Sequence, residues 1–402
     1  MHISIPLLII CFLVTNTDAA EPARPYRLIY NSDASNMFYA AKPPMQAADV
    51  YRFVDEVADA GGVTTFYMCP NYGMPVIYPS KVTQMFGTGL NPEQKKLVAK
   101  VAALKPSSER GAANLKALVD AGHDPMALVI NRAKAKGMEA FISFRPNEVH
   151  WVNKPNDFPI SLLLSEFWQK NPQWRIGKAG DPLSQLQRDI LGKRTSPIVA
   201  GWLPAGMNFA IPEVRAQRLA QLRECCERYN IDGLDIDFQR FPMYFRIGEE
   251  AANIQTMTNW VAEVRAMTKE VGKKRGREIL LSVRVMARTE QNIGLGLDPV
   301  NWAKKDLIDI VIASHYLHNN FPLPINEYRK LLPESIPVYG SIEVEPKAEG
   351  YRKIAKQLWE DGVDGILMFN YFTCRERGVE PDFDLLKELG DPKKLTSAST
   401  AN

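Results

Sequence analysis

The sequence contains few of the residues that build metal and redox centres. Its 402 residues include five histidines and five cysteines. No His-x-His pair occurs on the first expected strand, which disfavours a metal-dependent hydrolase, and we expect no metal and no cofactor. The chain also lacks the Gly-x-Ser-x-Gly signal of a serine nucleophile. Where a phosphate loop would need hydrogen-bond donors, residues 340–343 read Gly-Ser-Ile-Glu and bring a negative charge instead.

An excess of charge of one sign is also absent. The formal net charge is +3, which is close to neutral for a chain of this length. Basic residues are spread along expected helices next to acidic ones, as Glu224 and Arg228 are, and this spacing is typical of a solvated helix face. We therefore expect no nucleic-acid partner.

Long apolar runs are missing as well. The run Ile3–Val14 is too short to cross the roughly 30 Å hydrocarbon core of a bilayer as a helix. Small residues suited to cleavage follow it at positions 17–19. We interpret residues 1–20 as a secretory signal peptide, and we expect a secreted or periplasmic protein with no membrane contact after cleavage. An uncleaved anchor is the alternative.

Four cysteines remain after the expected leader. Cys225 and Cys226 are adjacent on one expected helix, which favours separate thiols over a bridge between them. Cys69 and Cys374 each follow an expected strand, and an oxidising compartment would permit a bond between them. The sequence leaves that bond open.

Short apolar or β-branched runs recur along the rest of the chain, with helix patterns between them. Val50, Phe53, Val54 and Val57 mark one such helix, at the spacing of a buried helix face. Strands that alternate with helices form parallel sheets, and eight such units close most simply into a (β/α)8 TIM barrel. The expected strands are Arg27–Tyr30, Val63–Cys69, Glu139–Phe144, Gly233–Phe238, Glu278–Val285, Ile308–Ser314, Ile336–Val344 and Gly365–Phe372.

Glycines stand at the exits of several expected helices. Gly61, Gly137, Gly233 and Gly365 each lie between a helix and the next strand, where we expect a left-handed cap. This repeat supports a single α/β barrel domain over residues 21–390, followed by a disordered tail at 391–402. A doubly wound open sheet is the alternative.

Two connections are longer than a barrel needs. They run from residue 70 to about 124, after the second strand, and from residue 147 to about 212, after the third. Long loops after strands lie on the catalytic face of a barrel and often form binding walls. Tryptophans in the second loop provide platforms for sugar rings or form the loop's own core, and both interpretations are open. These are Trp151, Trp168, Trp174 and Trp202.

The fourth expected strand carries acids on one face. Because side chains alternate along a strand, Asp235, Asp237 and Gln239 share a side that points into the barrel. Glycoside hydrolysis requires two carboxyl groups, one to donate a proton and one to attack or to activate water. Asp237 and Glu343, at the ends of the fourth and seventh strands, form the best pair. Asp235 is the third catalytic candidate and is expected to lie deeper, as a hydrogen-bonded support.

Polar and aromatic residues follow the other strands at the same end. The arginines Arg145, Arg240, Arg284 and Arg288 suit the carboxylates or sulfates of an anionic sugar, or they pair with the acids. Both interpretations are open. The candidate substrate-binding residues are Arg145, His150, Trp151, Trp202, Gln239, Arg240, Arg284, His315, Tyr316 and Asn370.

Three runs of the chain resemble the glycosyl hydrolase-like family 10 proteins. They are Asn208–Arg215, Tyr229–Asp237 with the Arg-Phe-Pro at 240–242, and Asp124–Asn147. Members of that family are exported bacterial (β/α)8 barrels assigned to sugar chemistry. The resemblance implies the same fold and reaction class, and it indicates no particular substrate.

Two positions depart from related patterns. That family often has a second acid after the residue that matches Asp237, and here the position is Phe238. The strand is also similar to the family 18 chitinase signature Asp-x-x-Asp-x-Asp-x-Glu, through Asp232, Asp235 and Asp237, but Gln239 takes the place of the acid. A glutamine cannot donate the required proton, so substrate-assisted chitinase chemistry is not expected.

The sequence therefore predicts an exported glycoside hydrolase that acts on a poly- or oligosaccharide, with an anionic sugar as one option. The alternative is a catalytically silent glycan-binding barrel of the chitinase-like lectin type, which Gln239 keeps open. A barrel lyase or isomerase is a more distant third.

Overall fold

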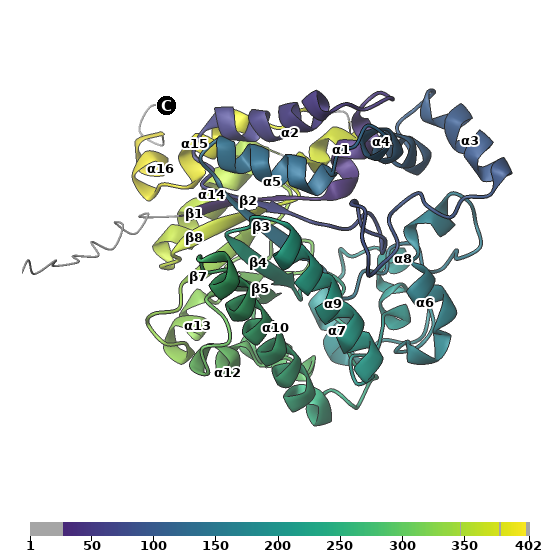
Figure 1. Cartoon of the computed structure of the whole chain (residues 1–402). Helices are drawn as coiled ribbons and strands as arrows, with labels where there is room; N and C mark the ends of the chain where they lie inside the picture. Colours follow the sequence, from purple (N-terminus) through teal and green to yellow (C-terminus); the bar gives the residue numbers. More distant parts are fainter. Residues whose placement is uncertain (1–26, 346, 378, 399–402) are drawn as a thin grey trace, which may run out of the picture.

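The computed structural model describes residues 27–398 except 346 and 378. Eight parallel strands form a closed barrel in the order β1 to β8, with helices around it (Figure 1). This confirms the predicted (β/α)8 fold, and each expected strand overlaps an observed one. The strands are β1 (Arg27–Ser32), β2 (Thr65–Met68), β3 (Glu139–Phe144), β4 (Gly233–Asp237), β5 (Leu280–Met286), β6 (Ile310–Ser314), β7 (Val338–Ile342) and β8 (Gly365–Phe369).

Helices follow every strand, and short 3-10 turns occur in the connections. The α-helices are α1 (Ala34–Ala40), α2 (Ala47–Ala60), α3 (Pro92–Ala102), α4 (Ser108–Asp120), α5 (Pro125–Ala135), α6 (Glu166–Lys170), α7 (Gln185–Leu191), α8 (Pro197–Ala200), α9 (Pro212–Arg228), α10 (Ile254–Arg275), α11 (Thr289–Gly294), α12 (Pro299–Lys304), α13 (Ile325–Leu331), α14 (Ala348–Glu360), α15 (Leu386–Leu389) and α16 (Pro392–Ala398). The 3-10 turns are η1 (Ile160–Leu163), η2 (Pro172–Trp174), η3 (Leu203–Ala205), η4 (Ala251–Asn253), η5 (Tyr371–Arg377) and η6 (Phe383–Leu385). No helix in the described part of the chain is both long and apolar enough to span a bilayer.

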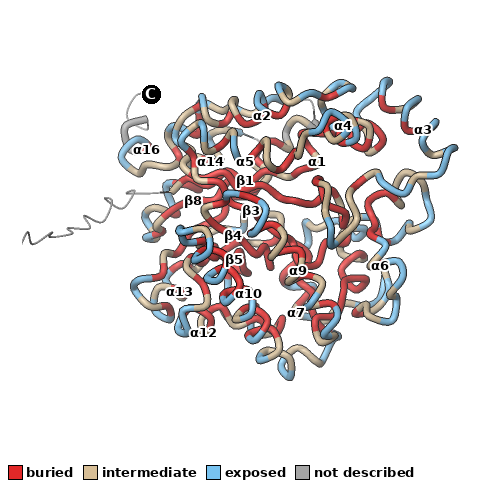
Figure 2. Tube along the Cα trace, in the orientation of Figure 1, coloured by how far each residue is buried: buried red, intermediate tan, exposed pale blue. Residues whose placement is uncertain are grey.

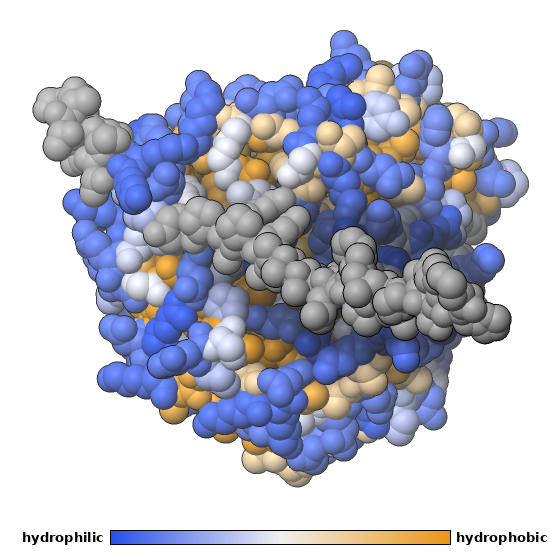
Figure 3. Space-filling model, turned by 60° about the vertical axis from the view of Figure 1, so that its left-hand side comes forward, coloured by the Kyte–Doolittle hydropathy of each residue, from blue (hydrophilic) through white to orange (hydrophobic). Residues whose placement is uncertain are grey.

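The outer helices bury one apolar face each against the barrel. In α2 the residues Val50, Phe53, Val54 and Val57 are all buried, as the helical spacing predicts. The buried residues therefore follow the strands and the inner helix faces, while exposed positions follow the outer helix surfaces (Figure 2). On the face that comes forward in Figure 3, hydrophilic residues cover most of the surface and leave small apolar patches between them.

The glycines at the helix exits serve two different purposes. Gly61 and Gly137 have positive φ values of 78° and 80°, a region that favours glycine. Gly61 has a ψ of 163°, so it does not adopt the left-handed helical conformation itself. Gly233 and Gly365 do not have positive φ, so the expectation of a left-handed cap was wrong for them. They lie inside strands, where a Cβ would meet the ring of Phe141 at 2.1 Å for Gly233 and a backbone oxygen at 2.6 Å for Gly365. Close packing, and not chain reversal, requires glycine there.

The two long connections hold short helices and pack on each other. The segment after β2 contains α3 and α4, and the segment after β3 contains α6, α7 and α8. The backbone N–H of Met74 donates to the carbonyl of Leu163 at 2.8 Å, and that of Glu166 donates to the side chain of Gln84 at 3.0 Å. Helices α3, α6 and α8 lie at the right-hand side of Figure 1.

Three aspartates share one arrangement at the amino ends of the strands. Each precedes an even-numbered strand, accepts a backbone N–H near the start of the preceding strand, and pairs with a basic side chain. They are Asp232 with Ala140 N at 2.9 Å and Lys134, Asp309 with Leu281 N at 2.7 Å and Arg265, and Asp364 with Val338 N at 2.7 Å and Arg329. Asp232 therefore lies at the opposite end of β4 from Asp237, although both match the chitinase-like run.

The chain ends differ from the sequence-based expectations. Residues 1–20, the expected signal peptide, lie outside the described residues. The expected disordered tail from 391 is corrected in part, because Pro392–Ala398 forms α16 and Leu395 in it is buried. Cys69 is a free, buried thiol, as are Cys225 and Cys226, so the bond from Cys69 to Cys374 is not formed in this structure; the side chain of Cys374 lies outside the described residues.

Candidate active site

Asp235 occupies the middle of the barrel. Its side chain is fully buried and accepts hydrogen bonds from Ser143 Oγ at 2.7 Å and Ser282 Oγ at 2.8 Å. The two serines are its register partners on β3 and β5, and Tyr67 lies beside Ser282 with their hydroxyl oxygens 2.9 Å apart. Burial, followed by the nearby charge of Asp237, raises the pKa of Asp235 to about 7. These contacts suit a buried support under the site.

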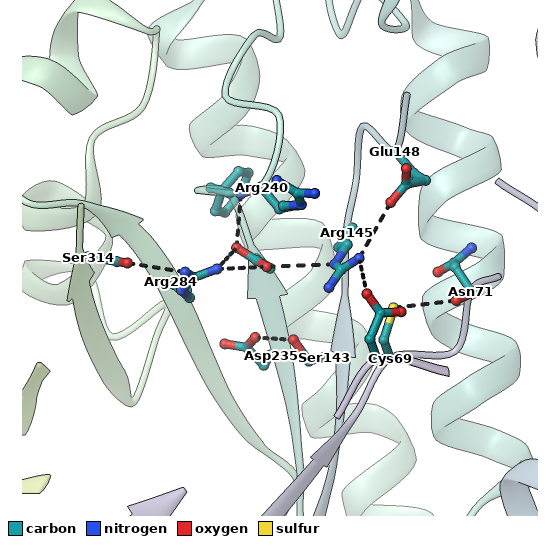
Figure 4. A network of polar contacts seen from close by, with 12 residues as sticks. Cys69, Asn71, Ser143, Arg145, Glu148, Asp235, Arg240, Arg284 and Ser314 are labelled. Carbon is teal, nitrogen blue, oxygen red and sulfur yellow. Dashed lines mark hydrogen bonds and ion pairs between the residues drawn. The ribbon is translucent and has the colours of Figure 1, made fainter. Parts of the chain in front are cut away.

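Asp237 lies one layer nearer the carboxyl ends of the strands, as the alternation along β4 predicted. Nη1 of Arg284 donates to both of its carboxylate oxygens at 3.1 Å, and the backbone N–H of Arg240 donates to Oδ1 at 3.0 Å. Nε of Arg145 lies 3.9 Å from Oδ2 (Figure 4). The ion pair with Arg284, which the sequence also allowed, is therefore formed.

Arg284 connects the two candidate carboxyl groups. Its Nη2 donates to Glu343 Oε1 at 2.5 Å and to Ser314 Oγ at 3.1 Å, while Nη1 holds Asp237. The guanidinium lies over the ring of Phe369, 3.7 Å from the ring centroid, and the side chain is buried. Stacking and hydrogen bonds from three strands fix this cation between Asp237 and Glu343.

Glu343 follows β7 and is buried, whereas Glu345 is partly exposed. Burial raises the pKa of Glu343, and the charge of Asp237 acts in the same direction, against Arg284 and the hydrogen bond from Ser314 at 3.0 Å. Asn319 fixes the strand exit, since its Oδ1 accepts the backbone N–H of Glu343 at 2.8 Å. The structure thus brings Glu343, and not Glu345, onto the same guanidinium as Asp237.

A second group of charges lies at the ends of β3 and β4. Arg145 Nη1 donates to Asp33 at 2.9 Å and lies 3.6 Å from Glu148. Burial alone would raise the pKa of Glu148, but His150, Arg145 and Arg240 together lower it to about 2, so this acid is a carboxylate and no proton donor. His150 Nδ1 contacts Glu148, and His150 Nε2 lies 2.8 Å from Arg240 Nη2. This geometry assigns the imidazole proton to Nδ1.

The tryptophans of the long loop divide between the two interpretations. Trp151 is 40% exposed, and its ring lies 5.1 Å from that of Trp202. Trp202 is buried, donates its indole N–H to Asn153 at 2.8 Å, and has its ring 5.5 Å from His150. Trp168 is also buried, with its indole N–H donating to a backbone carbonyl at 2.8 Å. Trp151 is thus an exposed platform, whereas Trp202 and Trp168 belong to the loop core.

The remaining predicted residues line the ends of β4, β6 and β8. Gln239 is buried and donates from Nε2 to the carbonyl of His315 at 2.5 Å, which leaves its Oε1 without a partner among the described residues. Burial lowers the pKa of His315 to about 4 and raises that of Tyr316 to about 12. Asn370 directly follows β8, and its buried Oδ1 has no partner in the part of the chain that the structure describes. All four therefore follow strands at the carboxyl end of the barrel.

Backbone strain is concentrated at the same end. Four residues other than glycine have positive φ in the segments after β3, β4, β6 and β8: Trp151 at 63°, Phe241 at 59°, Leu317 at 55° and Asn370 at 51°. Such conformations cost free energy and persist where the surrounding structure imposes them, often at binding sites. Their position supports a functional role for this face.

Exposure rises outward from the carboxylates. The side chain of Asp237 is 1% exposed, that of Glu148 5%, that of His150 25%, and Trp151 is 40% exposed. A ligand would therefore reach the acids past His150 and Trp151. A surface cavity of about 690 Å³ lies elsewhere, between the two long connections and α9, and none of the site residues lines it.

Some site residues carried too little sequence signal to be found. Ser143, Ser282 and Ser314 are ordinary strand residues whose role depends on register with neighbouring strands, and Phe369 reads as a core residue. In contrast, Arg288 was expected at the site but is exposed and pairs with Glu327 on α13, because the chain has already turned outward. Within the described residues, no cluster of three or more His, Cys, Asp or Glu could hold a metal.

Comparison with known proteins supports the fold. No family model matches the sequence, and no curated protein matches it. The chain is similar to the glycoside hydrolase domain of PgaB (BpsB) from Bordetella bronchiseptica, with a TM-score of 0.55, 10% identity, and coverage of 91% of this chain and 99% of that one. A GH138 enzyme that targets pectin rhamnogalacturonan II gives a TM-score of 0.49 at 10% identity, over 91% of this chain and 38% of that one. At 10% identity the likeness to the PgaB domain shows the barrel fold and no more.

Proposed function

We propose that this chain is an exported glycoside hydrolase acting on a poly- or oligosaccharide. One observation carries the proposal: two buried carboxyl groups, Asp237 on β4 and Glu343 after β7, contact the same guanidinium at the carboxyl ends of the strands. Hydrolysis of a glycosidic bond requires such a pair with unequal proton affinities. The resemblance to the glycosyl hydrolase-like family 10 proteins and the expected signal peptide support the same class and an extracellular or periplasmic location.

The environments of the two acids suggest separate roles. Burial raises the pKa of Glu343, which suits a general acid that protonates the leaving oxygen. Asp237 accepts hydrogen bonds from Arg284 and from the backbone of Arg240, which suits the nucleophile or the base that activates water. Asp235 lies beneath and adds negative charge as it ionises, so we assign it a positioning role.

The first experiment is a glycan panel in which binding and product release are both measured. We expect Asp237→Asn to lower turnover by roughly a thousandfold or more while binding survives, since the amide keeps the shape but cannot attack or take a proton. Glu343→Gln should act similarly. Glu345→Gln is the matched control, because it removes a carboxyl group two residues after Glu343. It should retain most turnover.

Normal turnover by Asp237→Asn would contradict this assignment and make Glu148 or Glu345 the next candidate. The second candidate function is glycan binding without cleavage. It is favoured by Gln239, an amide where the chitinase-like signature has its acid, and by its unpaired Oε1. Binding by the wild-type protein without release of any product would establish that alternative.

A further inference from the structure

Two arginines lie beside Asp237 at the carboxyl ends of the strands, one through its guanidinium and one through its backbone. Arg145 follows β3, and its Nε lies 3.9 Å from Asp237 Oδ2. Arg240 follows β4, and its backbone N–H donates to Asp237 Oδ1 at 3.0 Å. Both side chains are more than nine-tenths buried. Any sugar that reaches Asp237 therefore lies next to both cations.

Arg145 is only partly satisfied by the protein. Its Nη1 donates to Asp33 at 2.9 Å and lies 3.6 Å from Glu148. Its Nη2 is buried and has no partner among the described residues. A buried donor of a charged group that lacks an acceptor destabilises the protein, so its persistence needs an explanation.

Arg240 has still more unused capacity. One N–H of its Nη2 contacts His150 Nε2 at 2.8 Å, and the guanidinium lies over the ring of Phe241, 4.4 Å from the centroid. Its Nε and Nη1 are buried and form no hydrogen bond of good geometry among the described residues, although the Tyr316 hydroxyl lies close enough to interact with the guanidinium. Nη2 carries two N–H groups, and His150 uses only one of them. The other can act together with Nε or with Nη1 as a pair of parallel donors. Such a pair matches the paired oxygens of a carboxylate or sulfate.

The local charge balance allows an anion here. The cations are Arg145, Arg240 and Arg284, and the carboxylates in contact with them include Asp33, Glu148 and Asp237. The two further acids are the ones that hold protons more strongly: burial, then the charge of Asp237, raises the pKa of Asp235 to about 7, and burial raises that of Glu343. A raised pKa makes each of these two acids easier to protonate, which lowers the negative charge that a ligand anion meets.

We infer that Arg145 and Arg240 form an oxyanion subsite that binds a carboxylate or sulfate group on the sugar. The inference deepens the proposed function, on which it rests for the nature of the ligand. Arg240 supplies the open fork, His150 holds the fork in place, and Arg145 supplies the second buried donor beside Asp237. The subsite would select acidic sugars over neutral ones of the same shape.

Tryptophan fluorescence can test the subsite with small probes, because Trp151 and Trp202 adjoin His150. The probes are D-glucuronate with its uncharged methyl ester, and glucose 6-sulfate with glucose. We expect glucuronate, glucose 6-sulfate or both to bind at least about tenfold more tightly than the neutral counterpart, as charge-assisted hydrogen bonds allow.

Variants locate the effect. Arg240→Gln should abolish the preference for the anion, and Arg240→Lys should keep only part of it, since lysine retains the charge without the planar fork. Arg288→Gln removes an exposed arginine that pairs with Glu327 and should leave the preference unchanged. Thermal unfolding of each variant checks that it is folded.

Equal binding of glucuronate and its methyl ester, together with equal binding of the sulfate and glucose, would overturn the inference, as would no binding of either anion. Binding of glucuronate alone supports a carboxylated sugar, and binding of the sulfate ester alone supports a sulfated one. If the protein prefers anions but releases no product from any glycan, the subsite is supported and only the proposed hydrolase activity fails. If the protein hydrolyses neutral glycans and shows no preference for anions, the proposed function stands and the subsite fails.

Discussion

The two ends of the barrel use charged residues differently. At the amino ends of the strands, carboxylates are matched to cations and to backbone N–H groups: Arg27 donates to Glu139 at 2.9 and 3.1 Å, and Arg265 donates to Asp309 at 2.7 Å through two nitrogens. In this set only Nε of Arg265 is buried without a partner among the described residues. At the carboxyl ends, buried nitrogens of three arginines form no hydrogen bond of good geometry in the described part of the chain. They are Nη2 of Arg145, Nε and Nη1 of Arg240, and Nε of Arg284.

This difference separates stability from binding within one scaffold. Matched ion pairs at the amino end join β1 to β3 and α10 to the start of β6, and they leave few donors for a ligand. Unmatched donors at the carboxyl end cost free energy in the unliganded protein, and a ligand with oxygen acceptors would recover it. Substitutions at the two ends should therefore change different measured quantities.

The largest effect on stability is expected from Asp309→Asn at the amino end. The amide can still accept the backbone N–H of Leu281, but buried Arg265 keeps only the exposed Glu278, at 3.9 Å, as a counter-charge. Breaking a buried pair of this kind costs about 3 kcal/mol. Urea unfolding measures the loss, and turnover of the folded fraction should be unchanged. The control is Asp384→Asn, which breaks an exposed pair with Lys387 and should leave the midpoint where it is. Equal midpoints for the two variants would contradict the comparison.

A pH-dependent effect is expected from Asp235. Its pKa in the folded protein is about 7, above the value of about 4 in an unfolded chain, so the folded state binds more protons between these values. The contribution of Asp235 to stability is therefore present below pH 4 and is lost as pH rises through 7, by an amount of order a few kcal/mol. Unfolding of the wild type and of Asp235→Asn at pH 5, 7 and 9 isolates this contribution. Parallel curves for the two proteins would exclude it.

The smallest effect is expected from Trp151, the exposed platform. Trp151→Ala should weaken glycan binding by about tenfold, as loss of a stacking face does, with little change in the unfolding midpoint. Trp202→Ala should instead lower the midpoint, because its buried ring packs in the loop core. Unchanged binding together with lost stability for Trp151→Ala would place this residue in the core as well.

Much of the fold could be predicted because its signals are local. Short apolar and β-branched runs located all eight strands, and the helical spacing of Val50, Phe53, Val54 and Val57 located a buried helix face. The glycines show where local signals stop. Gly61 and Gly233 were both expected before a strand, yet only Gly61 has positive φ, because the need for glycine at 233 comes from a ring on another strand.

The candidate site was predictable in outline for the same reason. Alternation along β4 placed Asp235 and Asp237 inside the barrel, with Asp237 nearer its carboxyl end. The sequence could not decide whether Arg284 would pair with acids or remain free for a ligand, since that depends on its register with Asp237 and on its reach to Glu343. It also could not separate Trp151 from Trp202, because exposure of a loop residue depends on what packs over it.

By itself the sequence determined the barrel, the end that carries the polar residues, and the direction of each strand side chain, since dihedral preferences and hydrophobic periodicity act over a few neighbouring residues. The tertiary structure alone decided which charges meet. Barrel closure brings Asp237 and Glu343, which lie 47 and 59 positions from Arg284 in the chain, onto its one guanidinium. It leaves Arg240 with an open edge, because the number of acceptors near each donor is fixed by packing across strands and not by sequence order.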